Sequence, residues 1–147
     1  MPNKVSTVDM LDDVSTSVQV CGACNAVRKE ADGRLVGDMF DGQGFVRGLA
    51  RKGRPAKGAS ALVVGAGGVG SAIAVAMAEA EVGRLALYDT RSEATEKLAD
   101  RLQQFFPKLS IQVGSNDPAG FEIVVNATLM GMEPGDPLPV DVERISK

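Results

Sequence analysis

The stretch GAGGVG at residues 65–70 has the residue types and spacing of a phosphate-binding turn. Gly65, Gly67 and Gly70 match the G-x-G-x-x-G pattern, in which the first glycine permits a tight bend and the second lets a pyrophosphate approach the backbone. The third glycine lets the following helix lie close to the strand, and that helix directs free N–H groups at the phosphates. The expected cofactor contacts in this turn are Gly65, Ala66, Gly67, Gly68, Val69 and Gly70.

The surroundings of this turn favour a dinucleotide site over a glycine-rich turn without a ligand. The apolar run ALVVG precedes it, as in a strand buried on both faces of a parallel sheet, and the small-residue segment SAIAVAMAEA follows it as a helix. Asp89 ends the next predicted strand about 20 residues further on, where an acidic residue binds the ribose of the cofactor. We therefore predict a nicotinamide dinucleotide as the cofactor.

Asp89 also bears on the choice between the two nicotinamide cofactors. Its carboxylate can accept hydrogen bonds from the ribose hydroxyls and repels a 2′-phosphate, which favours NAD. Arg91 keeps NADP open, because its guanidinium could pair with that phosphate. We expect Asp89, Thr90 and Arg91 to contact the adenosine half of NAD or NADP, with NAD favoured.

From Ala59 onward the pattern alternates between strands and helices, which predicts parallel strands joined by right-handed crossovers. The expected strands are ALVVG, RLALYD, LSIQV and EIVVNA, and the expected helices are SAIAVAMAEA and SEATEKLADRLQQFF. The linker GSNDPAGF is too short for a long helix, and VDVERISK begins another expected helix. The sequence therefore predicts an α/β fold with an incomplete Rossmann-like parallel sheet of about four strands.

The residues upstream of Ala59 have a different pattern. Apolar residues recur at helical spacing in residues 5–19, which predicts an amphipathic helix. Residues 23–40 have the pattern of a β-hairpin with its turn at Asp32 and Gly33. The segment DGQGF then starts a short helix that runs to about Arg51.

Composition excludes several kinds of site. The chain has no histidine, which removes histidine-based catalytic triads and histidine-ligated metals. Cys21 and Cys24 form a CGAC motif, but the residues after it have the pattern of a strand and not of the helix that would stabilise a reactive thiolate. We therefore expect two packing cysteines and no metal site.

The bulk composition is typical of a globular domain that buries a core. The 147 residues carry a net charge of −3, and the basic cluster at residues 47–57 lacks interleaved aromatic residues, so nucleic-acid binding is disfavoured. The apolar runs are far shorter than the ~20 residues of a membrane span, and no secretion signal precedes the folded pattern. We expect a cytoplasmic protein with a small-molecule substrate and no membrane partner, and a homodimer is left open.

Together with the nucleotide turn, the upstream motifs resemble those of the shikimate dehydrogenase family, including its quinate branch. MPNK resembles the family's proline-histidine-lysine motif, GACNAV its Gly-Ala-x-Asn-Thr segment, and GDMFDGQGF its Asn-Thr-Asp-Gly segment. NATLMGM resembles the Asn-Ala-Thr-x-x-Gly-Met stretch of the family's cofactor cleft. This last match adds three expected cofactor contacts, Asn126, Ala127 and Thr128. The match covers nearly the whole chain.

The resemblance implies a catalytic pair, Lys4 and Asp41, and a substrate-binding residue, Asn25. Hydride transfer from a secondary alcohol to a nicotinamide requires that the hydroxyl proton also move. A lysine in a closed cleft can take that proton, because burial readily lowers the pKa of a lysine, and an aspartate can balance the ammonium form. Simple local roles stay open, since Asp41 could cap a helix at residues 43–51 and Asn25 could satisfy nearby backbone groups.

The implied activity is that of an NAD(P)-dependent oxidoreductase acting on a shikimate- or quinate-like hydroxylated cyclic carboxylic acid. Met39 and Phe40 stand where the family has Asn-Thr, so we expect a more apolar pocket wall and leave room for a related substrate. Family members are considerably longer, so we expect a chain truncated at both ends and Lys4 in an incomplete pocket. Residues 1–40 would then be part of a substrate-binding domain and residues 41–147 an incomplete NAD(P)-binding domain. The alternative is a catalytically inactive dinucleotide-binding fragment or a regulatory module.

Overall fold

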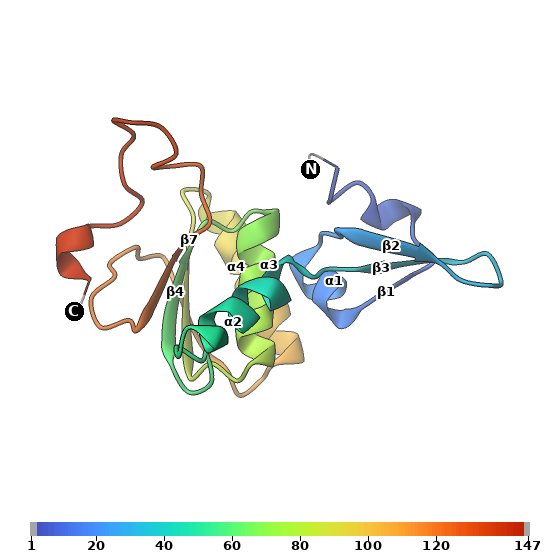
Figure 1. Cartoon of the computed structure of the whole chain (residues 1–147), viewed down its shortest axis with the longest axis horizontal. Coiled ribbons are helices and arrows are strands. Elements are labelled where there is room, and N and C mark those ends of the chain that lie inside the picture. Colours follow the sequence, from blue (N-terminus) through green and yellow to red (C-terminus); the bar gives the residue numbers. More distant parts are fainter. Residues whose placement is uncertain (1–2, 146–147) are drawn as a thin grey trace.

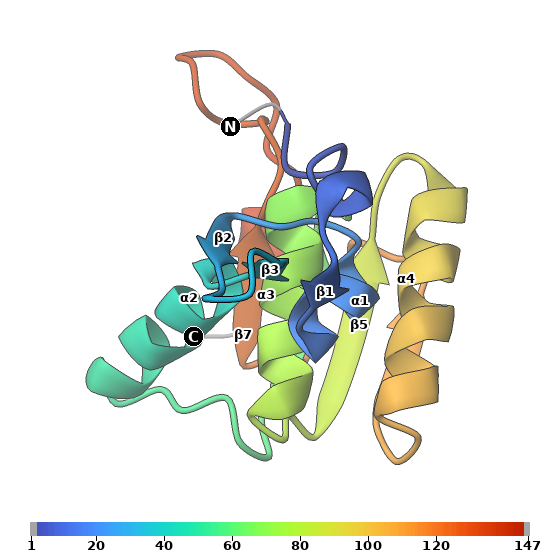
Figure 2. The same cartoon turned by 90° about the vertical axis from the view of Figure 1, so that its right-hand side faces the viewer.

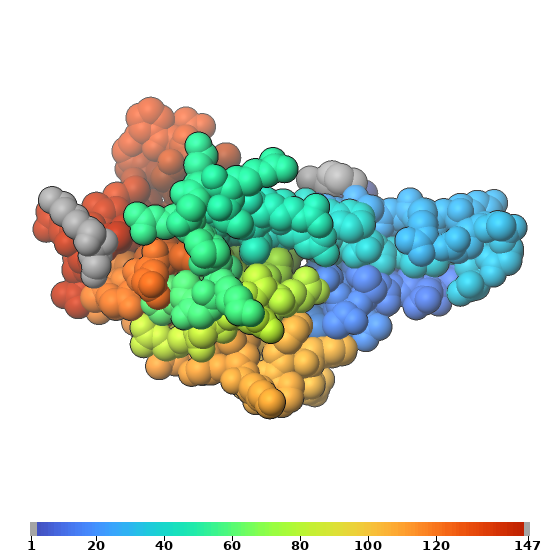
Figure 3. Space-filling view, turned by 60° about the horizontal axis from the view of Figure 1, so that its bottom comes forward, coloured from blue at the N-terminus to red at the C-terminus, as the bar shows by residue number. Residues whose placement is uncertain are grey.

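The computed structural model describes residues 3–145, which form two sheets with helices between them (Figure 1). The N-terminal sheet contains β1 (Asp13–Val14), β2 (Ala26–Lys29) and β3 (Leu35–Asp38) in the order β1-β3-β2. β2 and β3 are antiparallel, which confirms the predicted hairpin, and this hairpin projects from one end of the molecule (Figure 3). Gly33 occupies its turn with φ +93°, a conformation that favours glycine.

The amphipathic helix predicted for residues 5–19 is wrong. This segment contains a 3-10 turn, η1 (Val8–Met10), then β1, and then a short helix, α1 (Thr16–Cys21). β1 pairs in parallel with β3, and the Ser15 side chain caps α1 by accepting a hydrogen bond from the amide of Val18. Strand pairing and a local cap therefore outweigh the helical spacing of the apolar residues.

The second sheet is the predicted Rossmann-like one. It has four parallel strands, β4 (Ser60–Val64), β5 (Arg84–Tyr88), β6 (Ser110–Val113) and β7 (Ile123–Asn126), in the order β6-β5-β4-β7. This order places β4 in the middle, with the chain crossing to opposite sides of it, which is the arrangement that opens a ligand crevice at the carboxyl ends of the strands. The linker between β6 and β7 is a loop, as predicted.

Helix α3 (Gly68–Glu79) is the centre of the molecule. Figure 2 shows it between α2 (Asp41–Arg51) and α4 (Ser92–Phe105), and α1 also packs on it. Its side chains are buried on nearly every side, and most of them are small. Small residues let the neighbouring helices and the sheet approach closely, so α3 carries the main hydrophobic core.

The helix expected from VDVERISK is wrong for the part that is described. Val142–Arg144 form one 3-10 turn, η2, which Asp141 caps by accepting a hydrogen bond from the amide of Glu143. Arg144 Nη2 lies 2.8 Å from Asp117 Oδ2, so an ion pair joins this turn to the β6–β7 loop. Residues 146–147 lie outside the described residues.

None of the helices within residues 3–145 is both long enough and apolar enough to cross a membrane.

We predict that Leu102→Ala lowers the free energy of unfolding by about 2–5 kcal/mol, because it leaves a cavity between α4 and the core. Leu102 is 0% exposed, whereas Leu129 is 81% exposed and serves as the control. Urea denaturation of both variants checks this, and Leu129→Ala should change the unfolding free energy by less than about 0.5 kcal/mol. Equal losses in the two variants would contradict the assigned core.

Candidate active site

Lys4, Asn25 and Asp41 meet at the first residue of α2, although they come from three separate segments. Lys4 Nζ forms an ion pair with Asp41 Oδ2, and Asn25 Nδ2 donates a hydrogen bond of 2.6 Å to Asp41 Oδ1. Each carboxylate oxygen therefore has its own side-chain donor. The structure brings together the three residues to which the family resemblance gave roles at the substrate.

Lys4 is more buried than an incomplete pocket implies, with 16% of its side chain exposed. Its Cδ lies 4.0 Å from the position that a Cβ would take on Gly68, the first residue of α3. Its carbonyl accepts a hydrogen bond of 2.9 Å from the amide of Cys24. Most of the Lys4 side chain is therefore buried by the residues that the structure describes. Met1 and Pro2 of the MPNK motif lie outside the described residues.

The amino end of α2 excludes the capping role left open for Asp41 and gives Met39 and Phe40 different surroundings. Phe40 is the N-cap residue and Asp41 is the first residue of the helix, so the Asp41 carboxylate does not cap it. Met39 is 2% exposed and belongs to the core, whereas Phe40 is 49% exposed, so Phe40 is the residue of this pair that can contact a ligand. Asn25 has the local role as well, because its Oδ1 accepts a hydrogen bond of 3.0 Å from the Phe40 amide.

The neighbours of Asp41 set its charge. The hydrogen bond from Lys4 holds the pKa of Asp41 below its ordinary value, against the effect of burial, and the positive charge of Lys4 and the hydrogen bond from Asn25 act in the same direction as that bond. Asp41 is therefore a carboxylate at neutral pH. The site presents a charged acid–base pair without any histidine.

The glycine turn joins β4 to α3 by close backbone contacts. A Cβ on Gly70 would lie 1.8 Å from the carbonyl oxygen of Gly65, and Gly65 itself has φ +104°. A Cβ on Gly67 would meet nothing within 4 Å, so the backbone there faces open space. Tight closure at Gly65 and Gly70, with an open approach at Gly67, fits a pyrophosphate bound at the amino end of α3.

Asp89 lies at the carboxyl end of β5 and supports this turn. Its Oδ2 accepts a hydrogen bond of 2.8 Å from the Ala66 amide, and its Oδ1 accepts bonds from the Arg91 amide and Nε at 2.9 and 3.3 Å. Burial raises the pKa of Asp89, but these hydrogen bonds outweigh it, so the pKa lies below its ordinary value. Thr90 and Arg91 are exposed beside it.

Asn126 ends β7, and Ala127 and Thr128 follow it against the same turn. The Ala127 carbonyl oxygen is 2.7 Å from the position that a Cβ would take on Gly65. Asn126 Oδ1 accepts hydrogen bonds from the Thr128 amide and hydroxyl at 2.9 and 2.6 Å, which fixes the shape of the loop. The expected cofactor contacts therefore gather at the carboxyl ends of β4, β5 and β7.

The two cysteines pack into the core instead of facing this site. Both are buried and free, and their thiols donate to the carbonyls of Ala23 and Ala26 at 3.1 Å. Burial raises the pKa of Cys21, which is the last residue of α1, where the helix dipole does not stabilise a thiolate. Within residues 3–145, no group of three potential metal-ligating side chains could hold an ion.

Two residues that position the site were not singled out from the sequence. Asp38 accepts a hydrogen bond of 2.7 Å from the Ser15 hydroxyl, and its carbonyl accepts one of 3.0 Å from the Asn25 amide. Gly42 is buried where α2 meets α3. The signal for Gly42 was a glycine placed in the first turn of a predicted helix, a position where glycine is otherwise unfavourable.

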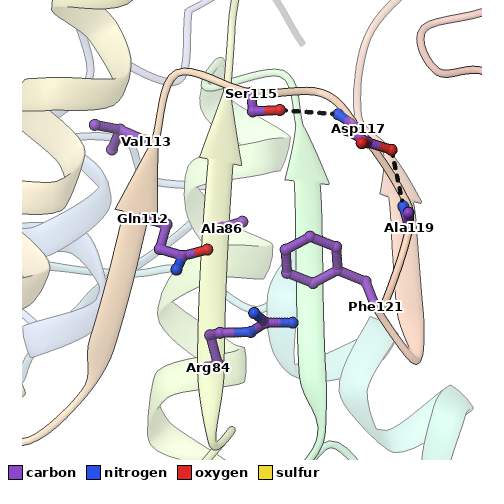
Figure 4. A pocket seen from close by; sticks show the side chains of 8 residues that line it. All are labelled: Arg84, Ala86, Gln112, Val113, Ser115, Asp117, Ala119 and Phe121. Carbon is purple, nitrogen blue, oxygen red and sulfur yellow. Dashed lines mark hydrogen bonds between the residues drawn. The ribbon is translucent and has the colours of Figure 1, made fainter.

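A hollow of about 520 Å³ lies on one face of the parallel sheet (Figure 4). Its lining comes from β5, β6 and the β6–β7 loop, and the Arg84 guanidinium stacks over the Phe121 ring at 4.5 Å. None of the residues that line it belongs to the expected site. We therefore place the candidate site at the strand ends and not in this hollow.

Comparison with known proteins relates this arrangement to one enzyme family. The chain is 34% identical to the shikimate dehydrogenase (NADP(+)) of Rubrobacter xylanophilus over 97% of this chain and 51% of that protein. The shikimate dehydrogenase of Thermus thermophilus, solved with NADP(H) and shikimate, matches with a TM-score of 0.82 and 31% identity over 99% of this chain and 52% of that one. A 5-ketofructose reductase of Gluconobacter, solved without ligand, matches with a TM-score of 0.82 and 30% identity over 99% of this chain and 54% of that one.

Three findings from these comparisons bear on function. No protein-family model matches the sequence. The chain spans about half the length of the curated relatives it matches. The names of these relatives specify NADP(+), so the expected preference for NAD has no support from them.

We predict that Lys4→Met raises the pKa of Asp41 toward its ordinary value of 3.8. Because the pKa of Asp41 is lower in the folded state, this group stabilises the fold above about pH 4, and the contribution is lost as the pH falls through the folded-state pKa. The variant should lose stability at neutral pH and depend less on pH below about 4. A ¹³C NMR titration of the Asp41 carboxyl and urea denaturation against pH check both effects.

Lys57→Met is the matched control for this prediction, because Lys57 pairs with Glu81 on the surface at 2.5 Å. It should leave the titration of Asp41 unchanged. An Asp41 pKa that is the same in Lys4→Met and in the unmodified chain would contradict the assigned pair.

Proposed function

Because the chain is homologous to shikimate dehydrogenases along its whole length, we propose that it acts as an NAD(P)-dependent oxidoreductase. The reaction moves hydride between a nicotinamide and a hydroxylated cyclic carboxylic acid of the shikimate or quinate type. The observation that carries this proposal is the position of the Lys4–Asp41 pair beside the first residue of α3. An acid–base pair next to a dinucleotide-binding turn is what alcohol oxidation requires.

The two parts of the chain contribute differently to this reaction. We assign residues 1–40, with Lys4 and Asn25, to the substrate side, and residues 41–147, with the glycine turn, to the cofactor side. Asp41 stands at the junction, as the first residue of α2. The groups proposed to react therefore lie where the substrate side meets the cofactor side.

The dinucleotide would be held by the turn at residues 65–70, by Asp89, Thr90 and Arg91, and by residues 126–128, and when bound it supplies the hydride acceptor. In the reductive direction the Lys4 ammonium donates a proton from Nζ to the substrate oxygen, and in the oxidative direction the neutral Lys4 amine takes the hydroxyl proton at Nζ. Asp41 balances the ammonium charge and fixes Nζ in place. Asn25 orients Asp41 and has a second amide hydrogen for a ring hydroxyl.

Two features bear on the choice of cofactor, and they favour different answers. The Asp89 carboxylate can accept bonds from ribose hydroxyls, as in NAD sites, but its hydrogen bonds to Ala66 and Arg91 already occupy part of its capacity. Arg91 is exposed and can pair with a 2′-phosphate, in keeping with the NADP(+) named for the relatives. We therefore propose either nucleotide and leave the choice to a titration with both.

Phe40 bears on the choice of substrate. Its half-exposed ring stands beside Asp41, where the family pattern has threonine. A ring there offers apolar contact in place of a hydroxyl, so we propose a shikimate-like acid and keep quinate and related hydroxy acids as alternatives. The cytoplasmic location remains a prediction from the sequence, which also leaves a homodimer open.

The test is to titrate NAD and NADP against the chain while following hydride transfer from shikimate and quinate at 340 nm. We predict that Lys4→Ala removes turnover and leaves nucleotide affinity nearly unchanged, because Lys4 moves a proton and does not bind phosphate. Lys57→Ala, which alters an exposed lysine of a surface ion pair, is the control and should keep full turnover.

Three outcomes would overturn parts of this proposal. Nucleotide binding without turnover in the unmodified chain would support the alternative, a dinucleotide-binding module without catalysis. Failure to bind either nucleotide would exclude both functions. A fully active Lys4→Ala variant would refute the role of Lys4 alone.

A further inference from the structure

Gly42 touches the backbone of α3 at a distance that no side chain could occupy. A Cβ on Gly42 would lie 2.0 Å from the carbonyl oxygen of Ala72 and 2.8 Å from the Cβ of Ala76. Two other glycines of α2, Gly44 and Gly48, have nothing within 4 Å of the same position. Among these three helical glycines, only Gly42 is required by the packing.

This contact fixes the first turn of α2 against the first turns of α3. Asp41 precedes Gly42 directly, and Ala72 lies two residues after Gly70, whose own position is set by the carbonyl of Gly65. The link from the glycine turn to Asp41 therefore runs through backbone atoms in contact, with no flexible side chain between them. Contacts of this kind hold a distance more tightly than side chains do, because they cannot change rotamer.

Lys4 also lies against the amino end of α3. Its aliphatic stem lies against Gly68, so both members of the ion pair are positioned relative to the amino end of α3. A shift of α2 away from α3 would move Asp41 and leave Lys4 behind. The Lys4–Asp41 contact therefore depends on how closely α2 approaches α3.

We propose that Gly42 is a positioning residue, which sets Asp41 in place relative to Lys4 and to the dinucleotide-binding turn. The effect on ion-pair geometry stands by itself, and the effect on turnover rests on the proposed function. A Cβ at this position forces α2 outward, because the atom it meets first is a backbone carbonyl that cannot turn aside. A displacement near 1 Å at a catalytic group can lower turnover about 10²-fold.

The test compares Gly42→Ala with Gly48→Ala, which adds the same methyl group to the same helix where space is open. Three quantities are measured on the full chain: the pKa of Asp41 by ¹³C NMR, NADP affinity by fluorescence, and kcat with shikimate. In Gly42→Ala we expect the pKa of Asp41 to rise and kcat to fall about 10²-fold, with NADP affinity unchanged because the glycine turn is intact. Gly48→Ala should change none of the three.

A second variant keeps the test decisive if Gly42→Ala does not fold. Ala76→Val enlarges the same contact from the α3 side and should shift the Asp41 titration in the same direction. A purely structural role for Gly42 would lower the unfolding midpoint and leave the Asp41 titration unchanged in the folded variants, and that result would overturn the proposal.

The outcome for Gly42 can be told apart from the outcome for the enzyme function. If the unmodified chain shows no turnover but Gly42→Ala still shifts the Asp41 titration, the positioning role stands and the proposed function fails. If the unmodified chain turns over and Gly42→Ala retains both its kcat and its Asp41 titration, the positioning role fails and the function stands.

Discussion

The turn between β4 and α3 is closed by backbone atoms in contact, and the rest of the site depends on that closure. The Gly65 amide donates to the Tyr88 carbonyl at 2.7 Å, and Gly70 packs on the Gly65 carbonyl. This fixes where α3 begins and the direction in which it runs. Because α1, α2 and α4 all pack on α3, the same closure determines where residues outside the nucleotide turn can stand.

The parts of the fold that were predictable are those whose pattern is local. ALVVG is an uninterrupted apolar run and RLALYD has an apolar centre, LAL, and the glycine spacing between them belongs to a turn with a known geometry. The prediction for residues 5–19 failed because β1 exists only through its pairing with β3, 23 residues further along the chain, which a local pattern does not contain. The spacing of the motifs pointed to the residues that the structure brings together. The burial of Lys4 and the closeness of Gly42 to α3 arise from tertiary contacts that periodicity does not encode.

The two carboxylates of the site are kept ionised by different means. Asp41 is held by side chains, the Lys4 ammonium and the Asn25 amide, whereas Asp89 is held largely by the backbone amides of Ala66 and Arg91. Side-chain partners can be exchanged with a substrate group during a reaction, because they can rotate away. Backbone partners cannot, which suits a residue that maintains the shape of a binding turn.

The ion pair and the nucleotide turn also differ in how far along the chain their partners lie. The Lys4–Asp41 pair joins residues 37 apart, whereas the first turn of α3 is tied back to the glycine turn by a bond between Ser71 and Ala66, 5 apart. Closing a longer loop costs more conformational entropy, so a contact between distant residues depends on the packing of the segments that carry them. The Lys4–Asp41 contact therefore exists only while the segment of Lys4 and the first turn of α2 both lie against α3, whereas the Ser71–Ala66 bond is local to the turn itself.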